Sequence, residues 1–450
     1  MTAVTDHTAR RLQALVAAEQ ASAQMPSLVA GIVRDGGLVW SGTHGLHTGS
    51  DQPTHDTQYR IGSITKTMTA VLVMQLRDEG RLDLNDPLEA HLPGVGYGDR
   101  TIRALLSHSS GMQSEPAGSW WERSPGVQYD ELAAAVDDSQ SPFAPGATYH
   151  YTNLAFGLLG EMVTRLRGAS WWDQVEHRIL RPLHMRRTSY LAAPPAATGY
   201  SVHHYAGTLT EEPAQDTGAM APAGQLWSTI ADLATYARFL LDGHDDVLPL
   251  STVQEMSTPQ SGTLAGGLST GYGLGLRLIA GGSGTLAGHT GSMPGFLAGL
   301  FVDRVRRTAA VCLANGTAGM RCEGLPLDLL TELERSEPTI VRPWTPTVHV
   351  PEAVAEVLGV WHWGNTAYAF SYDGTDLVVT SLTSGTTAHR FRQRGVGTFL
   401  GTAGYHNGEI LHVVRDQGGR VHHLSCATFI YTREPYDPSA PIPGGHPRSR

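Results

Sequence analysis

The chain has 450 residues, 41% of them hydrophobic and 16% charged, and its formal net charge is −10 at pH 7. This composition is typical of a soluble globular protein with one large core and a smaller second unit, and it excludes a disordered chain. Because the longest basic run is the RVRR of residues 304–307, neither nucleic acid nor an anionic membrane is an expected partner.

The N-terminal segment predicts a helix, because its arginines lie within an amphipathic pattern that includes Leu12, Leu15 and Val16. It has no apolar stretch followed by a cleavage site, so it is not a signal peptide. No apolar run approaches the roughly 18 residues of a membrane span. The cysteines have no CxxC spacing, which predicts neither a disulfide framework nor a zinc site. We therefore expect a cytoplasmic protein.

The following residues predict the start of a sheet and a central helix. Two β-rich runs flank residues 35–37, whose Asp-Gly-Gly sequence predicts a hairpin. Residues 64–79 are mostly apolar and predict a buried helix that begins after Ser63 and stops at Gly80.

Residues 100–245 predict a helical, loop-rich layer. In its last helix, Thr229 and Asp232 resemble a capping box, and Gly243 marks the end. At least three β-runs follow between residues 271 and 315, and we expect them to complete the sheet that the first hairpin begins.

The C-terminal part has a different pattern. Four prolines between residues 338 and 351 indicate a stiff linker. Short alternating runs separated by glycine-containing turns then predict a small up-and-down β-barrel. The expected domains are a catalytic domain at 1–338, a Pro-rich linker at 339–351, the barrel at 352–436 and an irregular tail at 437–450.

Lys66 is the only lysine in the chain, and Ser63 lies three residues before it. On a helix this spacing places the hydroxyl and the amine on one face. A serine becomes a strong nucleophile when a base takes its proton, and a buried lysine can be that base because burial favours the neutral amine. Arginine stays protonated and cannot replace it. The alternative is a surface lysine beside a chance serine.

Two further motifs offer related chemistry. Tyr151 and Asn153 precede an apolar helix, and a phenol can pass a proton while an amide can orient an acyl carbonyl. A packed tyrosine and a helix-capping asparagine are the alternative. His289, Thr290 and Gly291 lie in a β-run, where glycine permits a close backbone approach to a ligand. A hairpin with an incidental histidine is the alternative there.

In this order and at this wide spacing, the three motifs resemble those of the serine β-lactamase and penicillin-binding-protein family, which includes related esterases and D-aminopeptidases. LLSHSSGM at 105–112 and GQLWSTIADLATYARFL at 224–240 are similar to further stretches of that family. The resemblance covers roughly residues 8–335. It implies an α+β, class C β-lactamase-like fold, in which helices flank an antiparallel sheet beside an all-helical subdomain. A lipocalin-like barrel would follow.

The resemblance also implies chemical roles. Ser63 would be acylated, Lys66 and Tyr151 would share the acid and base work, and Asn153 would position the acyl group. Which of Lys66 and Tyr151 first takes the serine proton stays open, because two such groups titrate as a coupled pair.

Other positions would build the rest of the site. The backbone N–H groups of Ser63 and Ser292 would form an oxyanion hole. Thr290, Gly291 and Trp227 would contact the substrate, whereas His108 is expected to be structural. The adjacent histidine pairs of the chain lack HExxH spacing, so neither a metal nor another cofactor is predicted.

One departure from the family pattern bears on the substrate. Many members have lysine where this chain has His289, and a neutral imidazole is less suited to a substrate carboxylate. The chain is most similar to the penicillin-binding-protein-type thioesterases, which release and cyclise nonribosomal peptides. The implied substrate is a peptidyl thioester on phosphopantetheine or a small thiol, with a peptidyl carrier protein as candidate partner. Arg433 would recognise the peptide's end, unless it is a solvated arginine at a strand end.

Three functions therefore stay open. The first is a serine thioesterase that forms a macrolactam, with hydrolysis as a side reaction. The second is an esterase or D-stereospecific aminopeptidase that uses the same catalytic residues. The third is a non-catalytic protein that binds an apolar ligand in its barrel. Whether the peptide's own amine or water attacks the acyl-enzyme depends on how well the site excludes water, which the sequence does not reveal.

Overall fold

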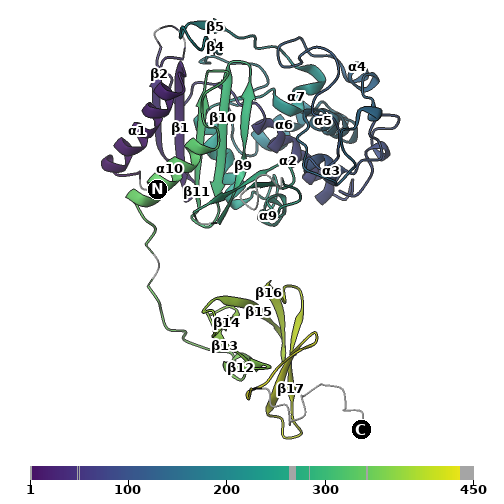
Figure 1. Ribbon diagram of the computed structural model, residues 1–450, viewed down its shortest axis with the longest axis vertical. Coiled ribbons are helices and arrows are strands. Elements are labelled where there is room, and N and C mark those ends of the chain that lie inside the picture. The colour runs from purple at the N-terminus through teal and green to yellow at the C-terminus, as the bar shows by residue number, and fades with distance from the viewer. Residues whose placement is uncertain are drawn as a thin grey trace. The chain divides into compact units, whose positions relative to one another are not determined.

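The computed structural model describes residues 3–47, 49, 51–262, 270–282, 284–340 and 343–435. The chain forms two compact units, Met1–Ile340 and Val341–Arg450 (Figure 1). The predicted tail at 437–450 lies outside the described residues. Among the helices of the described part, none is both long and apolar enough to cross a membrane.

A seven-stranded antiparallel sheet is the centre of the first unit, in the order β2-β1-β11-β10-β9-β8-β7. The predicted hairpin is confirmed, since Gly36 takes a φ of +77° in the turn between the first two strands. The first strand then pairs with the last, with Leu28 opposite Ala314. The strands are β1 (Ser27–Arg34), β2 (Gly37–Gly45), β7 (Thr270–Tyr272), β8 (Arg277–Gly281), β9 (Gly284–Met293), β10 (Phe296–Asp303) and β11 (Thr308–Ala314).

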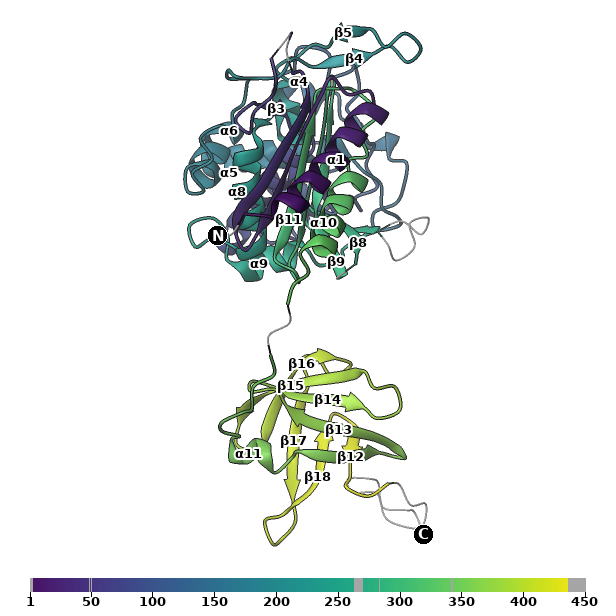
Figure 2. The same cartoon turned by 90° about the vertical axis from the view of Figure 1, so that its left-hand side faces the viewer.

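Helices cover both faces of this sheet. On one face, α1 (Asp6–Ser22) and α10 (Gly324–Ser336) lie side by side (Figure 2). Leu28 of β1 joins the core beneath these two helices, whereas Val29 joins the core on the opposite face, where α8 (Ile230–Asp242) packs. The apolar run of β1 therefore reflects a strand that is buried on both sides.

The rest of the first unit is a helical and loop-rich layer, which includes the predicted buried helix and the helices predicted within residues 100–245. Its helices are α2 (Ile64–Asp78), α3 (Ile102–Leu106), α4 (Tyr129–Ala134), α5 (Asn153–Arg167), α6 (Trp171–Val175), α7 (Ala221–Gly224) and α9 (Leu250–Met256), with short turns η1 (Leu88–Ala90), η2 (Asp138–Gln140), η3 (Glu176–Leu180) and η4 (Gly218–Met220). The layer is not purely helical, because two short ladders interrupt it. They are β3 (Tyr59–Arg60) with β6 (Trp227–Ser228), and β4 (Tyr200–Val202) with β5 (Leu209–Glu211).

The capping box predicted for α8 is half formed. Thr229 is the N-cap, its Oγ1 accepts from the backbone N of Asp232, and Gly243 ends the helix as predicted. The Asp232 carboxylate instead accepts hydrogen bonds from Arg187 N and Thr188 Oγ1, both at 2.8 Å. The acidic residue therefore fixes a distant segment to the helix start.

The second unit is the predicted small barrel. Its eight strands pair strictly in chain order, which is an up-and-down arrangement. Backbone hydrogen bonds between His362 and Thr432, at 2.7 and 2.9 Å, join the two edges and nearly close the barrel. Its elements are α11 (Glu352–Ala355), β12 (Gly359–Trp363), β13 (Thr366–Tyr372), β14 (Leu377–Ser381), β15 (Thr387–Gly395), β16 (Thr398–Gly404), β17 (Ile410–Arg415), β18 (Val421–Cys426) and β19 (Phe429–Tyr431).

Candidate active site

Ser63 is the residue at the N-terminus of α2, where the helix dipole favours negative charge. Three residues later, the Lys66 side chain is completely buried within this helix. Its Nζ donates to Ser63 Oγ at 2.8 Å and to the carbonyl oxygen of Ala223 at 2.6 Å. The predicted pair therefore forms, and α7 supplies the carbonyl that holds the amine in place.

Burial lowers the pKa of Lys66 to about 7, against the attraction of the Glu115 and Glu122 carboxylates, which favours the protonated form. Near neutral pH a large fraction of this amine is therefore uncharged and able to accept a proton. An amine in this state beside a serine hydroxyl is a suitable general base.

Tyr151 lies just before the N-terminus of α5 and faces the same serine. Burial raises the pKa of its phenol far above the ordinary value, and a hydrogen bond to Ser63 opposes this shift only in part. Lys66 Nζ lies 5.1 Å from the centre of the Tyr151 ring. At neutral pH the phenol keeps its proton, so it is suited to donate or relay a proton while the amine accepts one.

Asn153 is not the cap of its helix, which was the alternative role for this residue. Thr152 is the N-cap of α5, and its Oγ1 accepts from Ala155 N. Asn153 Nδ2 donates instead to Glu115 Oε1 at 2.7 Å, and the other carboxylate oxygen accepts from Trp121 Nε1 at 2.8 Å. Glu115 therefore orients the amide, and it is a site residue that the sequence motifs did not indicate.

His289 is a neutral imidazole in a defined tautomer. Its Nδ1 lies 2.5 Å from the Thr290 carbonyl, which can only accept, so this nitrogen carries the hydrogen. Its Nε2 then accepts from the Tyr272 hydroxyl at 2.8 Å. Burial and the nearby charge of Lys66 lower the His289 pKa to about 3. The third motif therefore supplies no cation, and Tyr272 is a second residue that the motifs missed.

The end of β9 lies directly against the segment before Ser63. A Cβ added to Gly291 would lie 2.0 Å from Ile61 O, and one added to Gly62 would lie 2.5 Å from Ser292 N. Only glycine allows this approach. The contact brings the backbone nitrogen of Ser292 beside Gly62, the residue that precedes Ser63, and the oxyanion hole of Ser63 and Ser292 stays a prediction. Thr290 and Ser292 are both accessible from solvent.

Two predicted substrate contacts, Trp227 and Arg433, are each engaged by other groups of their own unit. Trp227 is 3% exposed and packs edge to face on Phe296 at 5.0 Å, which favours a packing role. Arg433 lies within the barrel unit, where its guanidinium stacks on Trp361 at 3.7 Å and donates to carbonyls at both ends of the α11–β12 connection. These contacts engage the guanidinium within the barrel unit, and its role in recognising the peptide's end stays a prediction.

His108 lies beside Tyr151 and the start of α5. Its Nδ1 accepts from Thr152 N at 3.1 Å, and its ring lies 4.2 Å from that of Tyr151. Burial lowers its pKa well below the ordinary value. Among the described residues, no group of three or more histidine, cysteine or acidic side chains could hold a metal ion.

The sequence profile described as Beta-lactamase matches residues 12–333. The chain belongs to the Beta-lactamase family. It is thus a member of a family of serine hydrolase-type enzymes, and the Ser63 site lies within the matched region. A second profile, a domain of unknown function (DUF7586), matches residues 350–433, which include the barrel.

Curated relatives share this family. Beta-lactamase-like protein 2 from Dictyostelium discoideum is 30% identical, over 52% of this chain and 46% of the relative. Penicillin-binding protein 4 from Amycolatopsis lactamdurans is also 30% identical, over 51% of this chain and 62% of the relative. The chain spans about half the length of the curated relatives it matches.

Several solved structures are also similar to this Beta-lactamase family member. SurE is 27% identical with a TM-score of 0.63, covering 95% of this chain and 99% of SurE. A D-stereospecific amidohydrolase from Streptomyces sp. is 31% identical with a TM-score of 0.61, over 74% of this chain and 99% of that chain. The octameric penicillin-binding protein homologue from Pyrococcus abyssi shares the fold. It is 22% identical with a TM-score of 0.66, and the match covers 95% of this chain and all of the homologue.

Proposed function

We propose that the protein is a serine acyltransferase that takes a peptidyl thioester onto Ser63 and releases the peptide as a head-to-tail macrolactam, with hydrolysis as a side reaction. The observation that carries the proposal is the contact of Ser63 Oγ with the buried amine of Lys66, whose pKa of about 7 leaves it free to accept a proton. The thioester would arrive on the phosphopantetheine arm of a peptidyl carrier protein, or on a small thiol.

In the first half-reaction, Lys66 Nζ accepts the proton of Ser63 while Oγ attacks the thioester carbon. The N–H groups of Ser63 and Ser292 receive the negative oxygen that develops at the N-terminus of α2. The C–S bond then breaks, and the thiol leaves with a proton that Lys66 or the Tyr151 phenol supplies. The product is an ester between the peptide and Ser63.

In the second half-reaction, the peptide's own amine attacks the ester carbon. A C–N bond forms, the bond from the carbonyl carbon to Ser63 Oγ breaks, and the proton lost by the amine returns through Lys66 and Tyr151 to Oγ. The amide of Asn153, oriented by Glu115, holds the acyl group during this exchange. Water in place of the amine gives a linear acid.

Two observations favour this substrate over a β-lactam or a cell-wall peptide. The neutral His289 and its Tyr272 partner offer no fixed cation for a substrate carboxylate. The likeness to SurE extends over 95% of this chain, and a structure of SurE with D-Leu is also similar, at 26% identity and a TM-score of 0.60. We infer a peptide whose carboxyl-terminal residue has the D configuration.

Peptidyl N-acetylcysteamine thioesters of several lengths, ending in either a D- or an L-residue, test this function. The expected product from the D-series is a cyclic peptide, lighter by one water than the linear acid in mass spectrometry. Ser63→Ala should form neither product. If only linear acids appear across the whole series, the cyclase proposal fails and a hydrolase remains.

A D-stereospecific hydrolase is the second candidate, because the amidohydrolase from Streptomyces sp. is 31% identical over 74% of this chain. Release of ammonia from D-amino acid amides, without any cyclic product from the thioesters, would favour it. A non-catalytic binding protein is the third candidate. Failure of a fluorophosphonate to label the folded protein at Ser63 would favour that function over both enzymes.

A further inference from the structure

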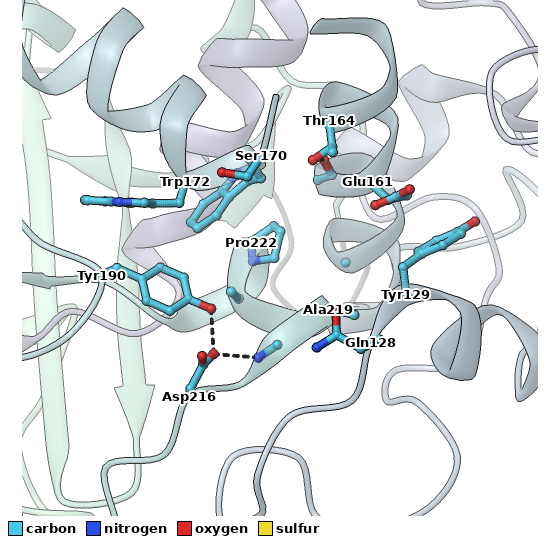
Figure 3. Close-up of a pocket in the computed structure, with 15 residues that line it drawn as sticks. Gln128, Tyr129, Glu161, Thr164, Ser170, Trp172, Tyr190, Asp216, Ala219 and Pro222 are labelled. Atoms are coloured by element: carbon cyan, nitrogen blue, oxygen red, sulfur yellow. Dashed lines mark hydrogen bonds between the residues drawn. The ribbon is translucent and has the colours of Figure 1, made fainter. Parts of the chain in front are cut away.

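A cavity of about 390 Å³ lies in the helical layer of the first unit (Figure 3). Residues of α5, α6 and α7 line it, together with the segments that carry Gln128 and Asp216. None of the site residues named above forms part of its wall. Its volume falls within the range of small-molecule sites, whose walls are mostly apolar with a few polar groups.

The walls of this cavity offer aromatic faces around small residues. Trp172 and Tyr190 stand on one side and Tyr129 on the other, with Pro222 between them (Figure 3). Gly160 of α5 lets Pro222 pack directly against the helix, because a Cβ there would lie 2.0 Å from Pro222 Cγ. The cavity is therefore shaped for a compact aromatic or branched apolar body.

The charged groups that line the cavity are both acidic. Glu161 is paired, since its Oε1 accepts from Arg165 Nε at 2.9 Å. Asp216 accepts from the Tyr190 hydroxyl at 2.6 Å and from Gly218 N at 2.9 Å, and both bonds end on Oδ1 (Figure 3). These two bonds fix the carboxylate and leave Oδ2 for another donor.

A buried cation lies near this carboxylate but is directed elsewhere. The charge of Arg60 interacts with Asp216, yet its NH2 group donates to Gln215 O at 2.9 Å and to Gln225 Oε1 at 3.0 Å. Asp216 is thus a fixed carboxylate beside aromatic faces. A cation with an apolar body matches both features, because aromatic rings also attract cations.

We propose that this cavity is a second ligand site, which binds a small molecule with an ammonium group on an aromatic or branched apolar body. The ammonium lies on Asp216 Oδ2, and the body lies between Pro222 and the rings of Trp172 and Tyr190. A free amine and the N-terminal residue of a peptide share this chemistry.

The wall between this site and Ser63 is α7. Pro222 lines the cavity, and its carbonyl accepts from Thr69 Oγ1 at 2.9 Å, while the next carbonyl, that of Ala223, holds Lys66 Nζ. The inference does not rest on the proposed peptide cyclisation, since it concerns binding on the other side of this helix.

Calorimetric titration of the full chain with three indole probes tests the site. Tryptamine carries the ammonium, tryptophol replaces it with a hydroxyl, and indole-3-acetate carries a negative charge. We expect tryptamine to bind with a Kd below about 1 mM. Its affinity should be about fivefold higher than that of tryptophol, which is the gain expected from one partly exposed ion pair. Indole-3-acetate should bind most weakly. Titration with Trp-Gly amide shows whether a peptide N-terminus enters as well as a free amine.

Two variants locate the binding. Asp216→Asn should reduce tryptamine to the affinity of tryptophol, whereas Asp246→Asn, at an exposed carboxylate outside the cavity, should change nothing. Gln128→Trp should narrow the mouth and weaken all three probes, even if Asp216→Asn fails to fold. Fluorophosphonate labelling should stay at the wild-type level in both cavity variants. Any of three results would overturn the proposal. They are the absence of heat with tryptamine at about 5 mM, equal affinity for the three probes, and unchanged tryptamine binding in a folded Asp216→Asn protein.

Discussion

In the proposed mechanism the buried amine of Lys66 must lose a proton near neutral pH, which gives this position a chemical reason to be lysine. Lys66→Arg keeps the positive charge but cannot act as a base. We expect the rate of Ser63 labelling by a fluorophosphonate to fall by about 10²- to 10⁴-fold, the usual contribution of a general base. Lys66→Met, which places no charge in the site, serves as the folding control in a thermal melt. Retained labelling in Lys66→Arg would remove Lys66 from the catalytic set.

The pH dependence of acylation should follow the protonation of Lys66. Below pH 7 the amine is protonated and cannot accept the serine proton, so the acylation rate should rise with pH to a midpoint near 7. The Glu115 carboxylate favours the protonated amine and thus keeps this pKa from falling further. Glu115→Gln should therefore lower the Lys66 pKa and move the midpoint of the labelling rate to lower pH.

A matched substitution separates this effect from a general change of charge. Glu131→Gln removes an exposed carboxylate that is not among the groups acting on Lys66, so its midpoint should stay near 7. Labelling rates measured across the pH range give all three midpoints. An unchanged midpoint in Glu115→Gln would mean that this carboxylate does not set the Lys66 pKa and serves only to hold Asn153 and Trp121.

Residues differ in how well the sequence could predict them. Ser63 and Lys66 are three residues apart on one helix, so local geometry alone predicts their contact. Glu115 reaches Asn153 across 38 positions, and Tyr272 reaches His289 across 17, so these contacts exist only because the tertiary fold creates them. Trp227 lies in the family-like stretch 224–240, but its packing on Phe296 is likewise set by tertiary structure.

At the scale of elements, the proposed oxyanion hole depends on how closely β9 approaches the start of α2. Gly291→Ala places a methyl group 2.0 Å from Ile61 O. Because this is a contact with backbone, it can be relieved only if β9 moves. We expect the variant to lose about 1–3 kcal/mol of stability, as overpacked sites do. Displacement of Ser292 N–H should also slow labelling of Ser63 by about 100-fold or more.

The control for this prediction lies in the same sheet. On β7, a methyl group at Gly271 would lie 3.4 Å from Ser261 O, an ordinary contact, so Gly271→Ala should affect neither the thermal midpoint nor labelling. If Gly291→Ala labels as fast as the wild type, the N–H of Ser292 does not serve as an oxyanion donor. The elements β9 and α2 would then meet for packing alone.

Element type followed from the sequence wherever a pattern was long enough to show its period. The first hairpin, α2 and α8 were predicted because each has a clear periodicity and a glycine at its end. The ladders β3–β6 and β4–β5 have two or three residues per strand, which is too short for an alternation to appear. The partner of the Asp232 carboxylate was wrongly predicted, because Arg187 and Thr188, which are remote in sequence, donate hydrogen bonds to it.

At the scale of the whole molecule, each unit has a core of its own, so a core substitution should act within one unit. In the barrel, Trp361 is fully buried, and its Nε1 donates to Val357 O at 2.8 Å. Trp361→Ala should cost the barrel about 3–5 kcal/mol. Trp363→Ala, on the same strand but 44% exposed, is the matched control and should cost much less.

Hydrogen exchange measured on the full-length protein resolves the two units in one experiment. In Trp361→Ala, amides of strands β12 to β19 should exchange faster, because opening of the barrel becomes easier. Amides of α2 and β9 should exchange as in the wild type, and fluorophosphonate labelling of Ser63 should be unchanged. Faster exchange in α2, with a loss of labelling, would show instead that the two units unfold as one cooperative body, and that the barrel stabilises the site in which Lys66 and Ser63 meet.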